Sequence, residues 1–374
     1  MKRIIYIMVA LLTLACRVED DYVTTSTTTT VTDPYVGEVG GMYLLNEGNM
    51  GSNKATLDYF DITTGKYHKN IFAERNPTVI KELGDVGNDL QAYNDRLYAV
   101  INCSNLVEVM SLDDATHVGE VAVPDCRYIV FRGDYAYVSS YQSSDDSGCG
   151  DIYKVELSSL TIVDRCQAGY QPEQMVVQGD KLYVTTSVKY ASNGAPTYDN
   201  RVMVIDLNSF EVVSEIEVAI NLHQIVEDSE GMLWVSSRGD YADNSSKIYR
   251  VNPTTELVIS ELDVASSSMT VSGEYLYIIS SEYSYITLEY TISWAVVYTP
   301  TESIASRSII TDGSDANISQ PYAIAINPET EDIYITDAKG FVVPGTLHCY
   351  SPAGELQWSV TTGDIPAKMI FRNR

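Results

Sequence analysis

The sequence has few histidines, few basic residues and no long apolar run, and each shortage narrows what the protein can do. Its 374 residues include 4 His, and 24 Lys and Arg stand against 51 Asp and Glu, which gives a net charge of −27. A chain this acidic repels nucleic acid and anionic lipid, so we expect neither as a partner. No apolar stretch reaches the roughly 18 residues that a transmembrane helix requires.

Signals of catalysis are equally scarce. The histidines are His68, His117, His223 and His348, and no two of them have the spacing of metal ligands. The sequence contains no nucleophile elbow and no phosphate-binding loop. We therefore expect no metal, no cofactor and no catalytic residue. His223 with Glu173 is the only arrangement that could act as an acid–base pair, and we favour the alternative that both are polar residues lining a channel.

The amino terminus is a targeting signal rather than part of the fold. Lys2 and Arg3 precede an apolar run from Ile4 to Leu14, and Ala15 and Cys16 follow at once. This order is typical of a bacterial lipoprotein signal, in which Cys16 becomes the lipidated first residue of the mature chain. The alternative is an ordinary secretory peptide in which the cysteine is coincidental.

A polar segment follows the signal. Residues 19–21 are an acidic run that resembles a surface-export signal of some Gram-negative bacteria, and a solvated charged tail is the alternative. Thr24–Thr30 contains six Thr and one Ser, too polar a composition to bury a core. We therefore expect a signal peptide over residues 1–16 and a flexible linker over residues 17–40. The mature protein is expected to be lipid-anchored at the outer membrane and exposed on the cell surface.

The remaining cysteines fit an exported protein, because disulfides form in oxidising compartments. The repeat described below places Cys103 and Cys126 at neighbouring loop ends, and it does the same for Cys149 and Cys166. We predict a disulfide within each of these two pairs. Cys349 is expected to be free and buried in a strand.

Residues 41–374 repeat one pattern seven times. Each unit consists of short alternating strands separated by polar turns, and its second strand carries an aromatic residue at a fixed position. The seven copies are Met42–Leu44, Leu97–Ala99, Ala136–Val138, Leu182–Val184, Leu233–Val235, Leu276–Ile278 and Ile333–Ile335.

The first unit lacks the inner strand that precedes the aromatic copy in the other six. Ala367–Phe371, at the end of the chain, has the pattern of the missing strand. β-Propellers close in this way, because the last strand completes the first blade and leaves only short, protected edges. The sequence therefore predicts an all-β fold, a seven-bladed β-propeller of four-stranded blades that is closed by its C-terminal strand.

In a propeller of this kind, one face gathers the loops between second and third strands and the starts of the inner strands. Several of these loops exceed the about two to five residues usual for hairpins, and long loops on one face are where function concentrates. They are rich in Tyr and amides, which suits a bulky, neutral ligand with many amide or hydroxyl groups. The predicted ligand-binding residues are Asn49, Lys54, Asn102, Arg127, Tyr141, Gln174, Tyr190, Tyr198, His223, Arg238, Tyr241, Tyr283, Tyr285, Tyr322 and Phe341.

Three stretches carry a resemblance to a known family. Leu44–Leu57, Lys81–Asp89 with Leu97–Asn105, and Tyr170–Gln174 resemble the YncE-like surface propellers of the BtuG type, which are cobalamin-binding lipoproteins. The resemblance covers the whole mature domain and is most specific in the first two blades. It implies a protein that captures cobalamin (vitamin B12) or a related corrinoid at the cell surface and delivers it to a TonB-dependent outer-membrane transporter.

Two alternatives stand beside corrinoid capture. The same face could bind another cargo, such as a glycan or a haem-like ring. A propeller lyase or lactonase is the third possibility, and its only support in the sequence is the His223 and Glu173 pair. We expect a binding protein rather than an enzyme.

Overall fold

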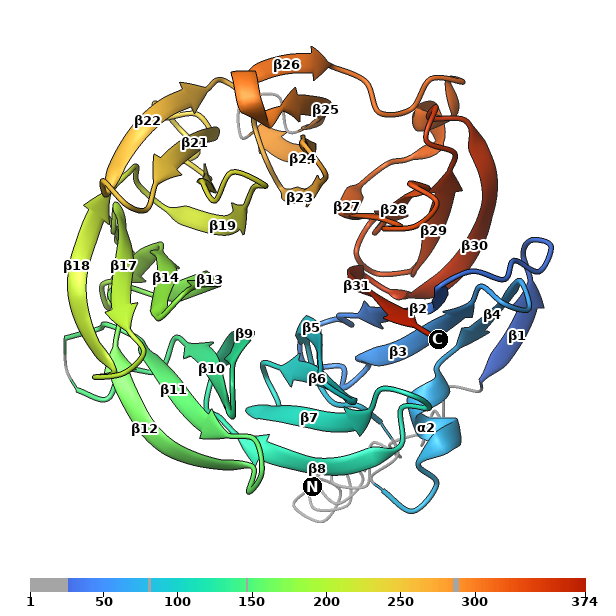
Figure 1. Cartoon of the computed structure of the whole chain (residues 1–374), viewed down its shortest axis with the longest axis horizontal. Helices are drawn as coiled ribbons and strands as arrows, with labels where there is room; N and C mark the ends of the chain where they lie inside the picture. The colour runs from blue at the N-terminus through green and yellow to red at the C-terminus, as the bar shows by residue number, and fades with distance from the viewer. Residues whose placement is uncertain (1–25, 80–81, 146, 285–288) are drawn as a thin grey trace, which may run out of the picture.

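The computed structural model describes residues 26–374 apart from 80–81, 146 and 285–288. These residues form a seven-bladed β-propeller whose blades follow one another in chain order around the ring (Figure 1). The prediction of an all-β propeller of four-stranded blades is therefore confirmed. The predicted signal peptide, residues 1–16 with Cys16 at its end, lies outside the described residues.

Each blade is an antiparallel sheet whose first strand lies nearest the propeller axis. Blades two to four consist of β5 (Gly87–Tyr93), β6 (Arg96–Ile101), β7 (Leu106–Ser111) and β8 (His117–Ala122); β9 (Cys126–Arg132), β10 (Tyr135–Ser140), β11 (Asp151–Glu156) and β12 (Thr161–Gln167); and β13 (Pro172–Gln178), β14 (Lys181–Thr186), β17 (Arg201–Asp206) and β18 (Glu211–Glu217).

Blades five to seven repeat this arrangement, with two 3-10 helices, η1 (Thr299–Thr301) and η2 (Ser314–Asn317), in their connections. Their strands are β19 (Leu222–Glu227), β20 (Leu233–Ser237), β21 (Lys247–Asn252) and β22 (Leu257–Leu262); β23 (Ser268–Ser272), β24 (Tyr275–Ser284), β25 (Glu289–Tyr298) and β26 (Ser303–Ser306); and β27 (Pro321–Ile326), β28 (Ile333–Asp337), β29 (Pro344–Tyr350) and β30 (Leu356–Asp364).

The first blade joins both ends of the chain. Its strands β2 (Val39–Asn46), β3 (Thr56–Asp61) and β4 (Lys66–Lys69) are completed on the axial side by β31 (Pro366–Asn373). Met369 pairs with Leu44 and Ile370 with Tyr43, as the predicted closure requires. The short helix α2 (Ile71–Arg75) then connects this blade to the second.

The hydrophobic core lies between blades rather than within any one of them. The aromatic residue of each second strand reaches toward a neighbouring blade, and the Tyr43 hydroxyl, for example, donates a 2.8 Å hydrogen bond to the Leu112 carbonyl oxygen of blade two. Each buried cluster combines residues from two adjacent blades, as Tyr98 of blade two and Ile129 of blade three illustrate. Burial of this kind is the main favourable contribution to folding, so each blade depends on both of its neighbours.

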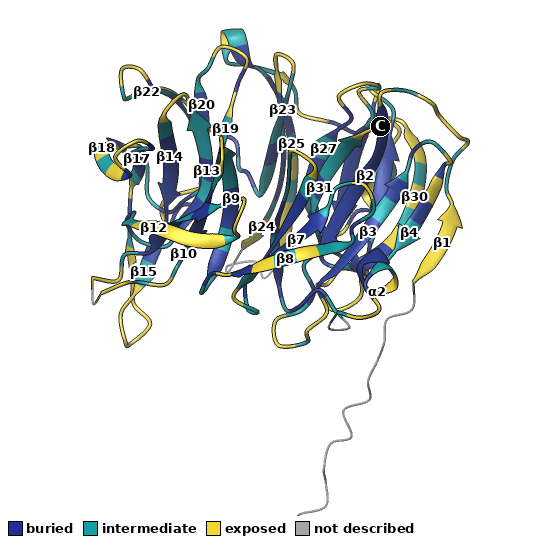
Figure 2. Ribbon diagram, turned by 60° about the horizontal axis from the view of Figure 1, so that its bottom comes forward, coloured by how far each residue is buried: buried dark blue, intermediate teal, exposed yellow. Residues whose placement is uncertain are grey.

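The structure differs from the sequence interpretation at the Thr-rich segment. Thr27–Thr30, assigned above to a flexible linker, forms strand β1 and pairs with β4 as a fifth, outermost strand of blade one (Figure 2). All four threonines are exposed, so backbone pairing rather than burial places this strand. Composition alone missed it because the open edge of β4 offers hydrogen-bond partners that a polar chain can use.

The predicted disulfides are also absent, since all five cysteines of the described residues are free. The Cys126 thiol lies buried beneath the carbonyl oxygens of Ile101 and Leu106, and burial raises its pKa to about 12. Cys103 instead contacts the Asn102 side chain in the preceding turn. Neighbouring positions in the repeat therefore do not bring the two sulfur atoms together.

The second predicted disulfide, between Cys149 and Cys166, is absent because the two residues belong to different local environments. Cys166 on β12 packs against the hydrophobic cluster between blades three and four, whereas Cys149 lies in the loop before β11. Cys349 is buried in β29. Among the described residues, no helix is long and apolar enough to cross a membrane.

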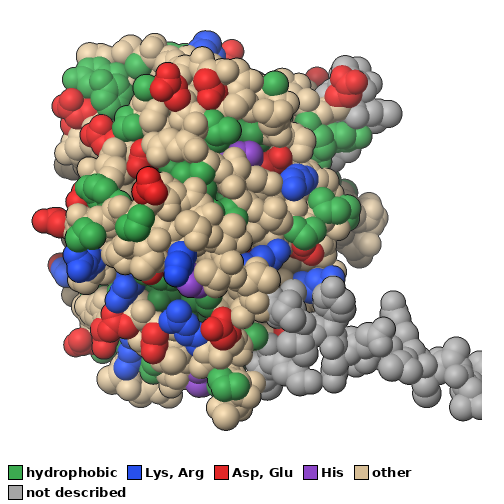
Figure 3. All heavy atoms as spheres, turned by 90° about the vertical axis from the view of Figure 1, so that its right-hand side faces the viewer, with side chains coloured by type: hydrophobic (Ala, Val, Ile, Leu, Met, Phe, Trp, Pro, Cys, Tyr) green, Lys and Arg blue, Asp and Glu red, His purple; other side chains and the backbone are tan. Residues whose placement is uncertain are grey.

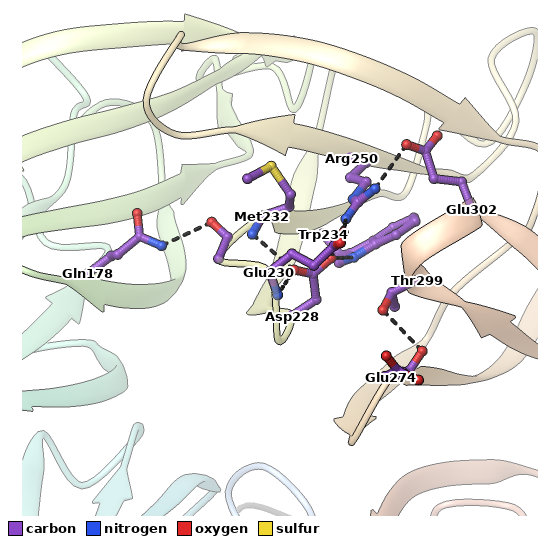
Figure 4. Close-up of polar contacts among 10 residues, drawn as sticks. Gln178, Asp228, Glu230, Met232, Trp234, Arg250, Glu274, Thr299 and Glu302 are labelled. Carbon is purple, nitrogen blue, oxygen red and sulfur yellow. Dashed lines mark hydrogen bonds and ion pairs between the residues drawn. The ribbon is translucent and has the colours of Figure 1, made fainter.

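A buried ionic cluster connects blades five and six at the end of the ring remote from the long loops. Asp228 accepts hydrogen bonds from Trp234 Nε1 and from Arg250 Nη2, both at 2.9 Å, and Arg250 Nη1 reaches Glu302 of blade six at 3.0 Å (Figure 4). The side chains of Asp228 and Arg250 are 0% and 5% exposed. A buried charge pair of this kind is strongly destabilising when one partner is removed.

We therefore expect Asp228→Ala to lower the free energy of unfolding by about 3 kcal/mol, because Arg250 and the Trp234 indole lose their shared acceptor. Urea unfolding followed by circular dichroism measures the change. Asp180→Ala is the control, since it removes an ion pair with Arg132 that is more than half exposed and should cost less than about 1 kcal/mol. If both variants lowered the free energy of unfolding equally, the buried ionic cluster would not have the stabilising role that we assign to it.

Candidate ligand-binding site

The described residues enclose a cavity of about 830 Å³ along the propeller axis. Residues of the inner strands of all seven blades line it, and these strands surround the centre of the ring in Figure 1. The loops between second and third strands of blades one, five and seven form its mouth, together with the facing ends of β24 and β25 in blade six. Cavities of roughly 300–1,000 Å³ are typical of small-molecule sites, so the axis can hold a ligand of substantial size.

The cavity wall combines aromatic rings with amides and a few charges. Tyr322 and Phe341 lie edge to face with ring centroids 5.8 Å apart, and Tyr283 faces Tyr290 across the β24–β25 hairpin at 5.1 Å. The aromatic side chains of the wall are Tyr128, Tyr241, Tyr283, Tyr290, Tyr322 and Phe341, and the amides are Asn88, Gln174, Gln224, Asn244 and Gln320.

Eight of the fifteen predicted ligand-binding residues line this cavity. Seven of them lie at the start of an inner strand or in a loop at the mouth, and Tyr283 lies near the end of β24. The eight are Arg127, Gln174, His223, Arg238, Tyr241, Tyr283, Tyr322 and Phe341.

Six other predicted residues lie outside the cavity. Asn49 and Lys54 belong to the β2–β3 loop, which Asp85 holds through the backbone NH groups of Gly51 and Asn53 at 2.7 and 3.2 Å. This loop therefore packs toward blade two rather than over the axis.

The other four have structural roles or lie further out. The Asn102 side chain is buried and hydrogen-bonds to the Cys126 carbonyl oxygen, while Tyr141 lies behind the wall. Tyr190 and Tyr198 belong to a separate hairpin of β15 (Val188–Tyr190) and β16 (Pro196–Tyr198). The remaining predicted residue, Tyr285, lies outside the described residues.

Several lining residues were missed from the sequence, among them Lys368, Tyr128 and Glu47. Lys368 and Tyr128 lie on inner strands, and Glu47 follows β2 at the mouth. Lys368 occupies in β31 the place that Gln174 occupies in β13, two residues before the partner of the repeated aromatic residue, so consistent use of the repeat would have found it. Glu47 lies in a loop that the sequence analysis noted, but one carboxylate among many gave no distinguishing signal.

Most charged groups around the axis are paired. Glu173, whose side chain is 1% exposed, accepts hydrogen bonds from the Tyr141 hydroxyl at 2.6 Å and from Arg238 Nη1 at 3.1 Å. Tyr322 donates to Glu47 at 2.6 Å, and burial raises the pKa of the Glu47 carboxyl group.

The cavity is more cationic than the rest of the molecule. Its wall carries Arg127, Arg238 and Lys368 against the carboxylates Glu47 and Glu282, whereas the whole chain has a net charge of −27. Figure 3 shows acidic side chains interspersed with basic and hydrophobic ones on the side of the ring formed by blades seven and one. The acidic surplus therefore lies largely outside the cavity.

His223 is a neutral side chain in this wall. Its Nε2 lies 3.0 Å from the Tyr128 hydroxyl oxygen. Burial and the charges of Arg238, Arg127 and Lys368 hold the His223 pKa well below 6.5. Glu173 is occupied by Tyr141 and Arg238, so the acid–base pair considered from the sequence is not joined by a hydrogen bond.

Together, these observations define a seven-bladed β-propeller with a cavity along its axis. The chain belongs to the family described as "Domain of unknown function (DUF5074)", which matches residues 40–363. No curated protein matches the sequence.

Solved structures with this fold come from several kinds of protein. A quinoprotein alcohol dehydrogenase-like protein from Bacteroides thetaiotaomicron is 13% identical, covers 89% of this chain and 78% of its own, and superposes with a TM-score of 0.61. AztD from Citrobacter koseri is 11% identical, with coverage of 90% and 98% and a TM-score of 0.54. The dihydro-heme d1 dehydrogenase NirN in complex with DHE is also 11% identical, with coverage of 93% and 80% and a TM-score of 0.52. These similarities show the fold alone.

We expect the His223 ring to remain neutral between about pH 8 and about pH 6, since its folded-state pKa lies well below 6.5. The unfolded chain takes up this proton and the folded chain does not, so His223 lowers stability as the pH falls below about 6.5. The His223→Gln variant should therefore be less acid-sensitive than the wild type. Imidazole NMR resonances, assigned with this variant, measure the titration, and a His223 midpoint at or above pH 6.5 would refute the expectation.

Proposed function

We propose that the protein captures a corrinoid such as cobalamin in its axial cavity and releases it unchanged. The observation that carries the proposal is a cavity of about 830 Å³ whose wall places aromatic rings beside amides. A corrinoid is a broad ring fringed with amide side chains. Aromatic faces can cover such a ring while Asn and Gln side chains bond to its amides.

The surface around the mouth supports a second part of the proposal, delivery to a protein partner. Met50, Tyr241 and Val342 are 78%, 59% and 74% exposed and lie in loops between second and third strands, and Tyr290, at the start of β25, is 48% exposed. Exposed apolar side chains gathered on one face mark interaction surfaces. We propose a TonB-dependent outer-membrane transporter as the partner.

The amino-terminal sequence supports a third part of the proposal, the location of the protein. Lys2, Arg3 and the apolar run before Cys16 have the order of a lipoprotein signal. We propose that Cys16 is lipidated and that it anchors the propeller at the outer membrane, exposed on the cell surface. Mass spectrometry of the mature protein, read for a lipid on Cys16, tests this part directly.

We expect cyanocobalamin to bind with one-to-one stoichiometry in titration calorimetry and to shift its visible absorbance to the red. Phe341→Ala should weaken binding by about 10-fold or more, because it removes an aromatic face from the cavity. Tyr275→Ala is the control, since Tyr275 is 41% exposed at the opposite end of β24 and should leave affinity unchanged.

Absence of binding at micromolar protein would reject corrinoid capture. A haem-like ring and a set of oligosaccharides, titrated under the same conditions, identify a different cargo. Recovery of cyanocobalamin with an unchanged absorption spectrum after incubation supports binding without chemistry, whereas a new product would indicate an enzyme.

A further inference from the structure

Arg127 is held firmly in the wall of the axial cavity. It is the second residue of β9, and its guanidinium carbon lies 4.7 Å from the centre of the Tyr141 ring. Asn88 donates a hydrogen bond to the Arg127 carbonyl oxygen and so fixes the backbone. Stacking on an aromatic face orients a guanidinium group without using any of its N–H donors.

These donors have no partner among the described residues. The other two cations of the cavity are paired, Arg238 with Glu173 at 3.1 Å and Lys368 with Asp89 at 3.3 Å. Arg127 makes no side-chain hydrogen bond or ion pair within the described part of the chain, and its Nε is fully buried. A guanidinium group carries five N–H donors, and to leave the buried Nε–H without an acceptor is costly. Arg127 is half-buried and lines the cavity, so a ligand there can supply acceptors for its N–H donors.

An unpaired, pre-oriented guanidinium group is suited to one class of partner. Its planar fork matches the paired oxygen atoms of a phosphate or a carboxylate, and hydrogen bonds between charged groups are stronger than those between neutral ones. Glu173 and Glu47 attract Arg127 electrostatically. Neither carboxylate accepts a hydrogen bond from Arg127, because Glu173 bonds to Tyr141 and Arg238 and Glu47 bonds to Tyr322. Charges farther away than about 8 Å are largely screened at physiological salt.

We propose that Arg127 forms an anion subsite in the axial cavity, and that it binds the phosphodiester group of a complete corrinoid. This assignment rests on the proposed function. Cobalamin carries this phosphodiester between its corrin ring and its nucleotide base, whereas cobinamide lacks both the phosphate and the base. Arg127 therefore allows the protein to distinguish a complete corrinoid from an incomplete one.

The test compares cyanocobalamin with dicyanocobinamide in titrations of the wild type, Arg127→Gln and Arg127→Lys. Arg127→Gln should weaken cobalamin binding by about 10- to 100-fold, the value of one or more charge-assisted hydrogen bonds, and leave cobinamide binding within about 2-fold. Arg127→Lys keeps the charge but loses the fork, so its loss should be smaller. Arg132→Gln is the matched control, because Arg132 lies on the same strand with a side chain 52% exposed on the surface.

Equal weakening of both corrinoids, or no weakening of either, overturns the phosphodiester assignment. If neither corrinoid binds the wild type, the proposed function fails, and inorganic phosphate then tests the subsite by itself. Phosphate should raise the thermal unfolding midpoint of the wild type and of Arg132→Gln above that in sodium chloride of equal ionic strength. The midpoint of Arg127→Gln should not rise, and a rise equal to that of the wild type, or none in the wild type, refutes the anion subsite.

Discussion

The pairing of β31 with β2 is the interaction on which the rest of the structure depends. Because the hydrophobic clusters lie between blades, an open ring would divide the cluster of blades seven and one and separate Met42 of β2 from Met369 of β31. The same strand also lines the axis and carries Lys368. Closure of the fold and completion of the cavity are therefore one event, and the cavity exists only when the chain ends have met.

The fold could be predicted from the sequence because the same strand pattern recurs seven times, so each copy supports the assignment of the others. A side chain at the start of an inner strand faces the axis in every blade, which is why Arg127 and His223 were predicted correctly as lining residues. Asn49 and Asn102 lie outside the cavity because single hydrogen-bonded contacts, rather than the repeat, decide where their loops and side chains lie. The disulfides failed similarly, since the buried direction of the Cys126 thiol is a property of local packing.

Although the protein is strongly acidic, basic side chains line the cavity along its axis. Arg238 and Lys368 are each held by a buried carboxylate, and these pairs act over a few ångströms, where salt screens them least. The outer surface, by contrast, supplies the repulsion that keeps an acidic protein soluble. Basic groups thus lie in the cavity and the acidic surplus lies on the outer surface. A ligand group that enters the cavity therefore meets more positive charge than it meets outside.

The register of β1 has a mechanical consequence. Thr27 pairs with Lys69 and Thr30 with Lys66, while the β3 residue nearest the mouth, Thr56, lies opposite Asn46. The polypeptide therefore enters the propeller from the side of the cavity mouth. A force applied through the preceding chain would act along β1, so it would load the backbone hydrogen bonds between β1 and β4 together rather than one by one. The same force would turn the cavity mouth toward the point from which the chain is pulled.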